Sequence, residues 1–216
     1  MKKLLRTALI GLISVSVFTA CQQKAEEKKE ESTEETTVET PAAEESTEEV
    51  RDGIVWTGSK VTGSHTGTVE FKESALKFEG EKLVGGSFVV DMTSLVDTDL
   101  DGEYKQKLEG HLKSDDFFSV EKHPTSKFMI TSVKDGAAAN EYEVSGDLTI
   151  KGITKPVTFP AKVEIKDKEA VATANVVVDR TLYDIKYGSN SFFDNLGDKA
   201  IDNDFKLEVR LSTVMQ

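Results

Sequence analysis

The stretch from residue 141 to residue 166, EYEVSGDLTIKGITKPVTFPAKVEIK, shows the dominant pattern of this chain. Every second residue is apolar over much of its length, which is the period of a strand with one buried and one wet face. The dipeptide Lys151-Gly152 interrupts the alternation at a point suited to a tight turn. The stretch therefore predicts an antiparallel hairpin. Its inward side chains are Tyr142, Val144, Leu148 and Ile150 on the first strand, and Val157, Phe159, Ala161, Val163 and Ile165 on the second.

The same alternation recurs along the chain on both sides of this hairpin. It is clear for Phe205, Leu207, Val209 and Leu211, and for Val84, Phe88, Val90 and Met92. Weaker candidate strands cover residues 66–72, 75–79, 126–134 and 170–179, and Gly80 and Asp135-Gly136 supply turns. About eight strands predict an all-β barrel or sandwich, and closure is favoured because it removes exposed strand edges. Periodicity alone does not separate a barrel with a cavity from a packed sandwich.

One segment departs from the strand pattern. In residues 101–112, Tyr104, Leu108 and Leu112 fall at helical spacing, and Asp101 stands where an N-cap would be. We expect a short helix here, lying over one end of the sheet.

Length and composition limit the classes of function. The chain has 216 residues, 38% of them hydrophobic, and a formal net charge of −12. An acidic chain lacks the clustered Lys and Arg with which nucleic-acid binders neutralise phosphates. One cysteine excludes a disulfide framework.

The N-terminus predicts targeting segments. Residues 1–20 have the basic start, short apolar run and small final residues of a signal peptide. Phe18-Thr19-Ala20-Cys21 resembles the lipobox of bacterial lipoproteins, so we expect Cys21 to carry a lipid anchor. Residues 21–50 are then a disordered acidic tether, and residues 51–216 the globular domain. The expected location is the cell envelope, on the outer membrane, facing either the periplasm or the cell surface.

Motifs for metals and catalysis are weak. Asp97-Thr98-Asp99-Leu100-Asp101-Gly102 matches the first half of an EF-hand calcium loop, but Leu108 stands where the bidentate Glu belongs. We favour a solvated acidic turn. His65, His111 and His123 are far apart in sequence, so no metal site is expected. The only cysteine is assigned to the anchor, and no nucleophile–base pair stands out, so the sequence does not indicate an enzyme.

Aromatic residues gather in two segments expected to connect strands. They are Phe117-Phe118 and Phe192-Phe193, with Tyr183 and Tyr187, and Arg180 and several Asp lie nearby. Two interpretations stay open. The cluster is either an apolar pocket rim with a few polar groups or a plug that closes a barrel end, with Arg180 paired to an Asp.

Several strings together resemble the YceI-like family. The resemblance covers most of residues 54–214 in the right order, although no single string is sufficient. The strings are Gly63-Ser64-His65-Thr66-Gly67, residues 86–95 (GSFVVDMTSL), residues 111–118 (HLKSDDFF), residues 146–157 (GDLTIKGITKPV), Asp179-Arg180 and Tyr183-Asp184.

This resemblance implies a lipocalin-like antiparallel barrel with a helical insertion, whose interior binds a polyisoprenoid such as a prenyl quinone or prenyl phosphate. No other cofactor is expected. The residues expected to line the tunnel are Val84, Phe88, Val90, Tyr142, Val144, Leu148, Val157, Phe159, Val163, Leu207 and Val209. Those expected near the head group are His65, His111, Arg180 and Tyr187. The rival hypothesis is a non-catalytic envelope interaction protein with a filled barrel. The expected partners are the isoprenoid lipid and the membrane, and a homodimer stays an open alternative.

Overall fold

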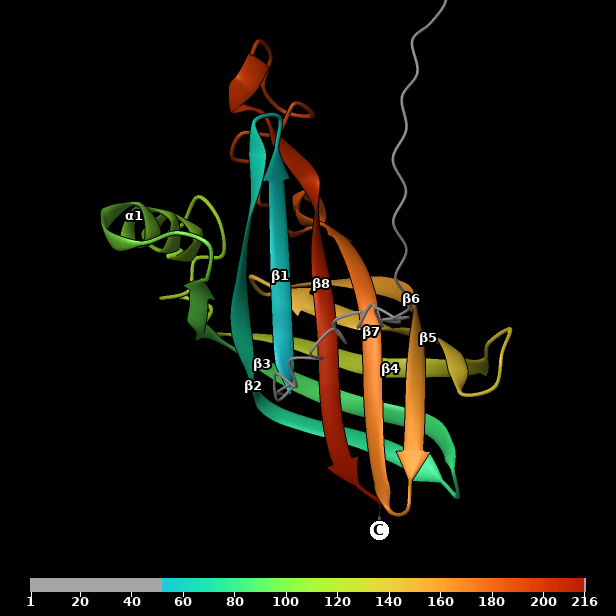
Figure 1. The fold of residues 1–216 in the computed structure, drawn as a ribbon. Helices are drawn as coiled ribbons and strands as arrows, with labels where there is room; N and C mark the ends of the chain where they lie inside the picture. The colour runs from blue at the N-terminus through green and yellow to red at the C-terminus, as the bar shows by residue number, and fades with distance from the viewer. Residues whose placement is uncertain (1–51, 216) are drawn as a thin grey trace, which may run out of the picture. The chain divides into compact units, whose positions relative to one another are not determined.

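The computed structural model describes residues 52–215, which form a closed barrel of eight antiparallel strands paired in sequence order (Figure 1). β8 returns to pair with β1 and closes the barrel. The strands are β1 (Gly53–Lys60), β2 (Gly63–Glu79), β3 (Lys82–Asp97), β4 (Thr125–Asp135), β5 (Glu141–Ile150), β6 (Ile153–Lys166), β7 (Glu169–Asp179) and β8 (Ile201–Val214). Within these residues there is one α-helix, α1 (Gly102–Lys113), and two short 3₁₀ helices, η1 (Arg180–Tyr183) and η2 (Gly197–Lys199).

The hairpin predicted from residues 141–166 is confirmed as β5 and β6. Lys151 and Gly152 both have positive φ angles, 51° and 75°, as a two-residue type I′ turn requires. That turn fixes the register, in which Ile150 lies opposite Ile153 and Val144 opposite Phe159. The apolar faces of both strands therefore point into the barrel together.

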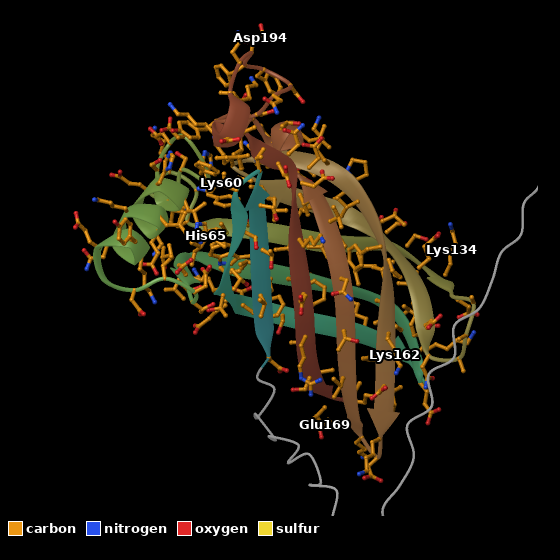
Figure 2. The ribbon with its side chains drawn as sticks, turned by 45° about the horizontal axis from the view of Figure 1, so that its top comes forward. Lys60, His65, Lys134, Lys162, Glu169 and Asp194 are labelled. Carbon is orange, nitrogen blue, oxygen red and sulfur yellow. The ribbon has the colours of Figure 1, made fainter. Side chains whose placement is uncertain are left out.

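The up-and-down order places alternate connections at opposite ends of the barrel. One end, called here the helix end, carries the β1–β2 turn, residues 98–124 with α1, the Lys151-Gly152 turn and residues 180–200. The other, the far end, carries only the short turns after β2, β4 and β6. Figure 2 labels Lys60 and His65 near α1, and Lys162 and Glu169 toward the far end. All long connections are thus gathered at the helix end.

The strand count agrees with the prediction, but two of its elements differ. The candidates at 66–72 and 75–79 are one continuous strand, β2, because a register shift between Phe71 and Glu73 interrupts the alternation without ending the pairing. β1 was not predicted. Its sequence, GIVWTGSK, has too few alternating positions to stand out.

The predicted helix is confirmed as α1, with two corrections. Asp101 stands at the N-cap position with an extended backbone, but its side chain makes no capping hydrogen bond. Tyr104 is 75% exposed, so it does not share the partly buried face of Leu108 and Leu112, which pack on the barrel core. The apolar face of α1 is therefore shorter than its spacing suggests.

The signal peptide, Cys21 and the acidic tether lie outside the described residues. Among residues 52–215, no helix has the length and apolar character needed to cross a membrane.

Candidate ligand-binding cavities

Two adjoining cavities occupy the barrel. The smaller, the far cavity, has a volume of about 130 Å³ and is lined mainly by apolar side chains of the strands. The larger, the helix-end cavity, has a volume of about 480 Å³ and extends to α1 and to residues 180–200. Ile54, Val90, Leu148 and Leu207 line both cavities, so the two share a wall. An elongated ligand can therefore contact both regions.

Most of the predicted tunnel residues face these cavities. Nine line the far cavity: Phe88, Val90, Val144, Leu148, Val157, Phe159, Val163, Leu207 and Val209. Tyr142 is buried but packs in the core among Leu83, Val144 and Val163 rather than against either cavity. Val84 was predicted to line the tunnel, but it lines neither cavity. It is 42% exposed because its neighbour Leu83, 4% exposed, takes the inward position on β3.

A row of aromatic rings spans part of the far cavity, and sequence reasoning found it only in part. Phe88 lies 6.0 Å from Phe128, and Phe128 lies 5.4 Å from Phe159, measured between ring centroids. Phe128 packs directly over Gly146, where an added Cβ would come within 2.5 Å of the ring. Phe128 lies in the weak candidate strand 126–134. The alternation of that strand was the signal that could have placed Phe128 inside the barrel.

All four predicted head-group residues line the helix-end cavity: His65, His111, Arg180 and Tyr187. They come from β2, α1, η1 and the segment after η1. His111 lies edge-on between two rings, with centroids 4.5 Å from Tyr187 and 4.9 Å from Phe117. Its Nε2 is 3.4 Å from the Oδ2 of Asp116. The fold therefore gathers polar groups with hydrogen-bonding capacity at this end.

Arg180 has a clear positioning role as well. It is 4% exposed, and its guanidinium donates hydrogen bonds to the backbone carbonyls of Ile185, Ile201 and Asp202 at 2.8, 3.0 and 2.9 Å. The plug interpretation of the sequence paired Arg180 with an Asp, whereas these three hydrogen bonds go to main-chain carbonyls. Burial lowers the pKa of Arg180 below its ordinary value. The side chain ties the β7–β8 connection to the start of β8.

The aromatic residues predicted to form either a pocket rim or a plug at the barrel end do not all lie in one place. Phe117, Phe118 and Tyr187 line the helix-end cavity, as a pocket rim would. Tyr183 is 1% exposed and packs in the core, where burial raises its pKa to about 12. Phe192 and Phe193 are about half exposed and line neither cavity.

Trp56 of β1 is a cavity residue that sequence reasoning missed. Its ring lies against Gly67 of β2, where an added Cβ would come within 2.4 Å of the indole. The indole Nε1–H is buried and makes no hydrogen bond within the described residues. Trp56 lines the helix-end cavity, so its ring adds apolar surface there. The unpredicted β1 concealed this residue.

The charges around the helix-end cavity are mixed. Lys60, Lys199 and Arg180 contribute three cationic groups, and Asp198, Asp202 and Asp204 contribute three carboxylates. This lining gives no strong preference for an anion.

The comparisons with known proteins agree with this architecture. A family model described as the YceI-like domain matches residues 33–213. The chain belongs to the YceI-like family. Protein YceI of Escherichia coli O157:H7 is 44% identical over 66 residues, which are 30% of this chain and 32% of that protein. A UPF0312 protein of Shewanella denitrificans is 33% identical over 89 residues, 41% of this chain and 44% of that protein. The matched regions thus span about a third to less than half of these curated relatives.

Solved structures extend the likeness of this YceI-like chain at the level of fold. Burkholderia cenocepacia BcnA has a TM-score of 0.62 at 18% identity, covering 76% of this chain and 96% of that chain. A polyisoprenoid binding domain from Saccharophagus degradans, implicated in plant cell wall breakdown, has a TM-score of 0.57 at 13% identity, covering 76% and 94%. The shared feature is the closed barrel.

Proposed function

We propose that this protein binds an amphiphilic polyisoprenoid, with the chain in the far cavity and the head group in the helix-end cavity. The observation that carries the proposal is the pair of adjoining cavities, one lined by strand side chains that are almost all apolar and one with a few directed polar groups. This division matches the usual make-up of a small-molecule site. Membership of the YceI-like family and the likeness to a polyisoprenoid binding domain support it.

The physical basis of affinity differs between the two cavities. Apolar ligand surface removed from water contributes about 25 cal/mol per Å². The far cavity supplies this burial through Phe88, Phe128 and Phe159. Polar groups add selectivity, because a head group that leaves buried donors unpaired binds less well. His111 and Tyr187 supply that part at the helix end.

Within the prenyl quinone or prenyl phosphate class, the lining favours a quinone. Asp198, Asp202 and Asp204 line the same cavity as the cationic groups and oppose the binding of a phosphate. Three hydrogen bonds of Arg180 already go to carbonyls of the chain. A neutral head with carbonyl acceptors suits the donors of His111 and Tyr187.

We further propose that the protein acts as a lipid-anchored, non-catalytic carrier in the cell envelope. The support is the lipobox-like string ending at Cys21 and the acidic stretch of residues 22–50, which has eleven Glu and three Lys. Such a tether self-repels and extends, so it would hold the barrel away from the membrane surface. Mass measurement of the mature N-terminal peptide tests this point, since the proposal requires an acylated Cys21.

The test of binding is native mass spectrometry and organic extraction of the full chain, produced with its leader and purified from the envelope. The wild type is compared with a cavity-blocking variant, Ala174→Trp, because Ala174 lines the far cavity and a large ring would fill it. A stoichiometric polyisoprenoid in the wild type, reduced at least tenfold in Ala174→Trp, is the expected result. An empty wild type that takes up no added prenyl quinone or prenyl phosphate would overturn the proposal and favour the interaction protein with a filled barrel.

A further inference from the structure

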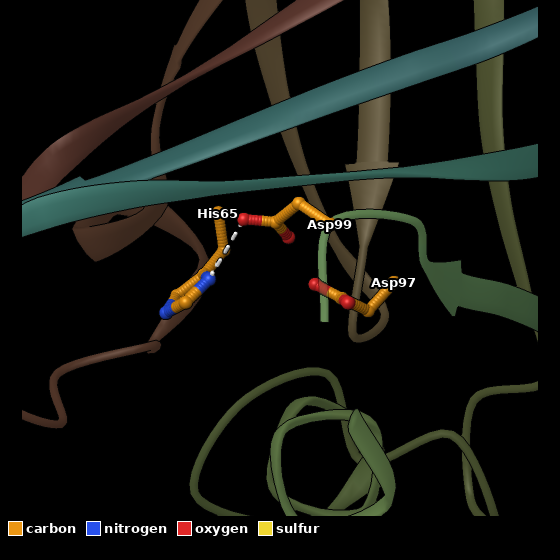
Figure 3. Close-up of side chains that lie close together, drawn as sticks. All are labelled: His65, Asp97 and Asp99. Carbon is orange, nitrogen blue, oxygen red and sulfur yellow. Dashed lines mark hydrogen bonds and ion pairs between the residues drawn. The ribbon is translucent and has the colours of Figure 1, made fainter. Parts of the chain in front are cut away.

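A cluster of one histidine and two aspartates lies where β2, the end of β3 and α1 meet. His65 comes from β2, Asp97 is the last residue of β3, and Asp99 lies in the connection to α1. One ligand atom from each lies within 4.8 Å of the others. Figure 3 shows the carboxylates of Asp97 and Asp99 and the ring of His65 directed toward one another. Residues distant in sequence thus converge on one small volume.

Asp97 is the unusual member of this cluster. Its exposure is 0%, which corrects the expectation of a solvated acidic turn at this residue, whereas Thr98, Asp99 and Asp101 are exposed as expected. Its Oδ1 accepts a hydrogen bond from the backbone N–H of Leu100 at 2.7 Å, but its Oδ2 has no hydrogen-bond partner in the described residues. Burial, followed by the neighbouring Asp99, raises the pKa of Asp97 above its ordinary value. A buried carboxylate oxygen without a donor is costly unless a cation or a proton satisfies it.

The other two members are positioned but retain freedom to adjust. His65 Nδ1 lies 3.1 Å from Asp99 Oδ2, and Asp99 Oδ1 accepts from the backbone N–H of Thr66 at 3.2 Å. Their side chains are 31% and 33% exposed. Solvent can therefore reach His65 and Asp99, so an ion and a water ligand have access to the cluster through these two side chains.

Neighbouring charges add to the negative potential. Glu109 of α1 accepts a hydrogen bond from the backbone N–H of Asp97 at 2.9 Å. Lys105 lies 3.9 Å from Glu109 and offsets one negative charge. Three carboxylates against one ammonium leave an excess of negative charge next to the buried oxygen.

We propose that His65, Asp97 and Asp99 bind a divalent transition-metal ion of the Zn²⁺ type. One imidazole nitrogen and two carboxylate oxygens are three protein ligands of the kinds that Zn²⁺ accepts, and water completes the usual four. A four-coordinate zinc ion holds its ligand atoms roughly 3–4 Å apart, so the cluster needs a small contraction, which the exposed side chains permit. Calcium is disfavoured because it takes six to eight oxygen ligands.

The bound ion would join β2 to the connection that leads into α1. His65 lines the helix-end cavity, and Leu108, His111 and Leu112 of α1 line it as well. The metal would therefore fix the helix that forms one wall of this cavity. The site stands independently of what the cavity holds.

The test is isothermal titration of the full chain with Zn²⁺ after treatment with a chelator, together with thermal unfolding with and without the ion. We expect one ion bound with micromolar or tighter affinity and a rise in Tm of about 5–10 °C at a hundredfold excess over Kd. Calcium at the same concentration should give no comparable shift.

Three variants assign the binding to this cluster. His65→Ala and Asp99→Asn remove partly exposed ligands, so we expect folded proteins that bind Zn²⁺ at least tenfold more weakly. Asp101→Asn is the matched control, because Asp101 lies in the same connection but outside the cluster, and it should bind like the wild type. Absence of zinc binding in the wild type would overturn the proposal. So would unchanged affinity in both ligand variants, because a thiol or another site would then hold the ion.

Discussion

The two ends of this barrel are built from the same eight strands but differ in what joins them. The far end closes with short turns and encloses an apolar cavity, whereas the helix end carries residues 98–124 and 180–200 and a larger cavity with polar groups. Strand alternation alone produces the far cavity, since inward positions are apolar along each strand. The helix end takes His111, Arg180 and Tyr187 from connections. The strands thus supply the apolar surface that would bury a ligand chain. The two long connections supply the polar groups that would select its head group.

The largest expected effect comes from placing a charge inside the barrel wall. Val176 lines the far cavity and is 6% exposed, while its neighbour Val177 points outward and is 57% exposed. We expect Val176→Asp to lower the free energy of unfolding by about 3–5 kcal/mol, because it buries an unpaired carboxylate. Val177→Asp should change it by less than about 1 kcal/mol. Urea unfolding of both variants measures the difference, and equal effects would show that β7 does not present Val176 to the interior.

Loosening the helix end should leave the far end intact. Arg180→Lys removes the fixed donor geometry that holds three carbonyls, so we expect a loss of about 2–3 kcal/mol. Hydrogen exchange should quicken in residues 180–200 and not in the β6–β7 hairpin. Equal acceleration in both regions would mean that Arg180 supports the whole barrel and that the ends are not separable.

Changes at the head-group site should alter selectivity and not the capacity for apolar chains. We expect His111→Ala to weaken binding of a prenyl quinone about 5–10-fold, which corresponds to about 1–1.4 kcal/mol. Binding of a polyisoprenoid hydrocarbon without a head group should be unchanged. A fluorescence competition assay with both ligands tests this, and equal weakening of both would contradict the division of roles.

The last effect appears only at alkaline pH and concerns the buried phenol of Tyr183. Its pKa of about 12 in the folded state lies above the value of about 10 for an unfolded chain. The unfolded phenol therefore loses its proton first, so the contribution of Tyr183 is intact below pH 10 and declines as pH rises toward 12. The urea midpoint should fall over that range less in Tyr183→Phe than in the wild type. Parallel curves would show that Tyr183 is not buried as described.

The sequence predicted the far end better than the helix end, for physical reasons. An alternating strand such as residues 157–165 has only one face to bury, so Phe159 and Val163 could be assigned inward without knowledge of their neighbours. The bulge after Phe71 breaks that period, which is why β2 was predicted as two strands. The short β1 has too few alternating positions, which is why β1 and Trp56 were not predicted. Val84 was assigned to the wrong face because Leu83, beside it, is equally apolar.

Residues in the long connections are harder to predict, because tertiary contacts decide their environment. Asp97 and Asp101 belong to one acidic string, yet Asp97 is fully buried and Asp101 is exposed. The difference follows from the position of Asp97 at the end of β3 beneath α1, with His65 brought close from β2. Arg180 was expected near the head group, but its three hydrogen bonds to carbonyls depend on the return of the chain to β8.

Photo-crosslinking tests the central claim most directly. Two prenyl quinone probes, one with a diazirine at the chain terminus and one with a diazirine beside the head group, would be bound to the full chain, and the labelled peptides identified by mass spectrometry. We predict that the chain-end probe labels β5 and β6 around Val144, Phe159 and Val163, and that the head-group probe labels α1 and residues 180–200. The same peptides labelled by both probes, or labelling confined to outward residues such as Met129 and Val177, would contradict the assignment of chain and head group to opposite ends.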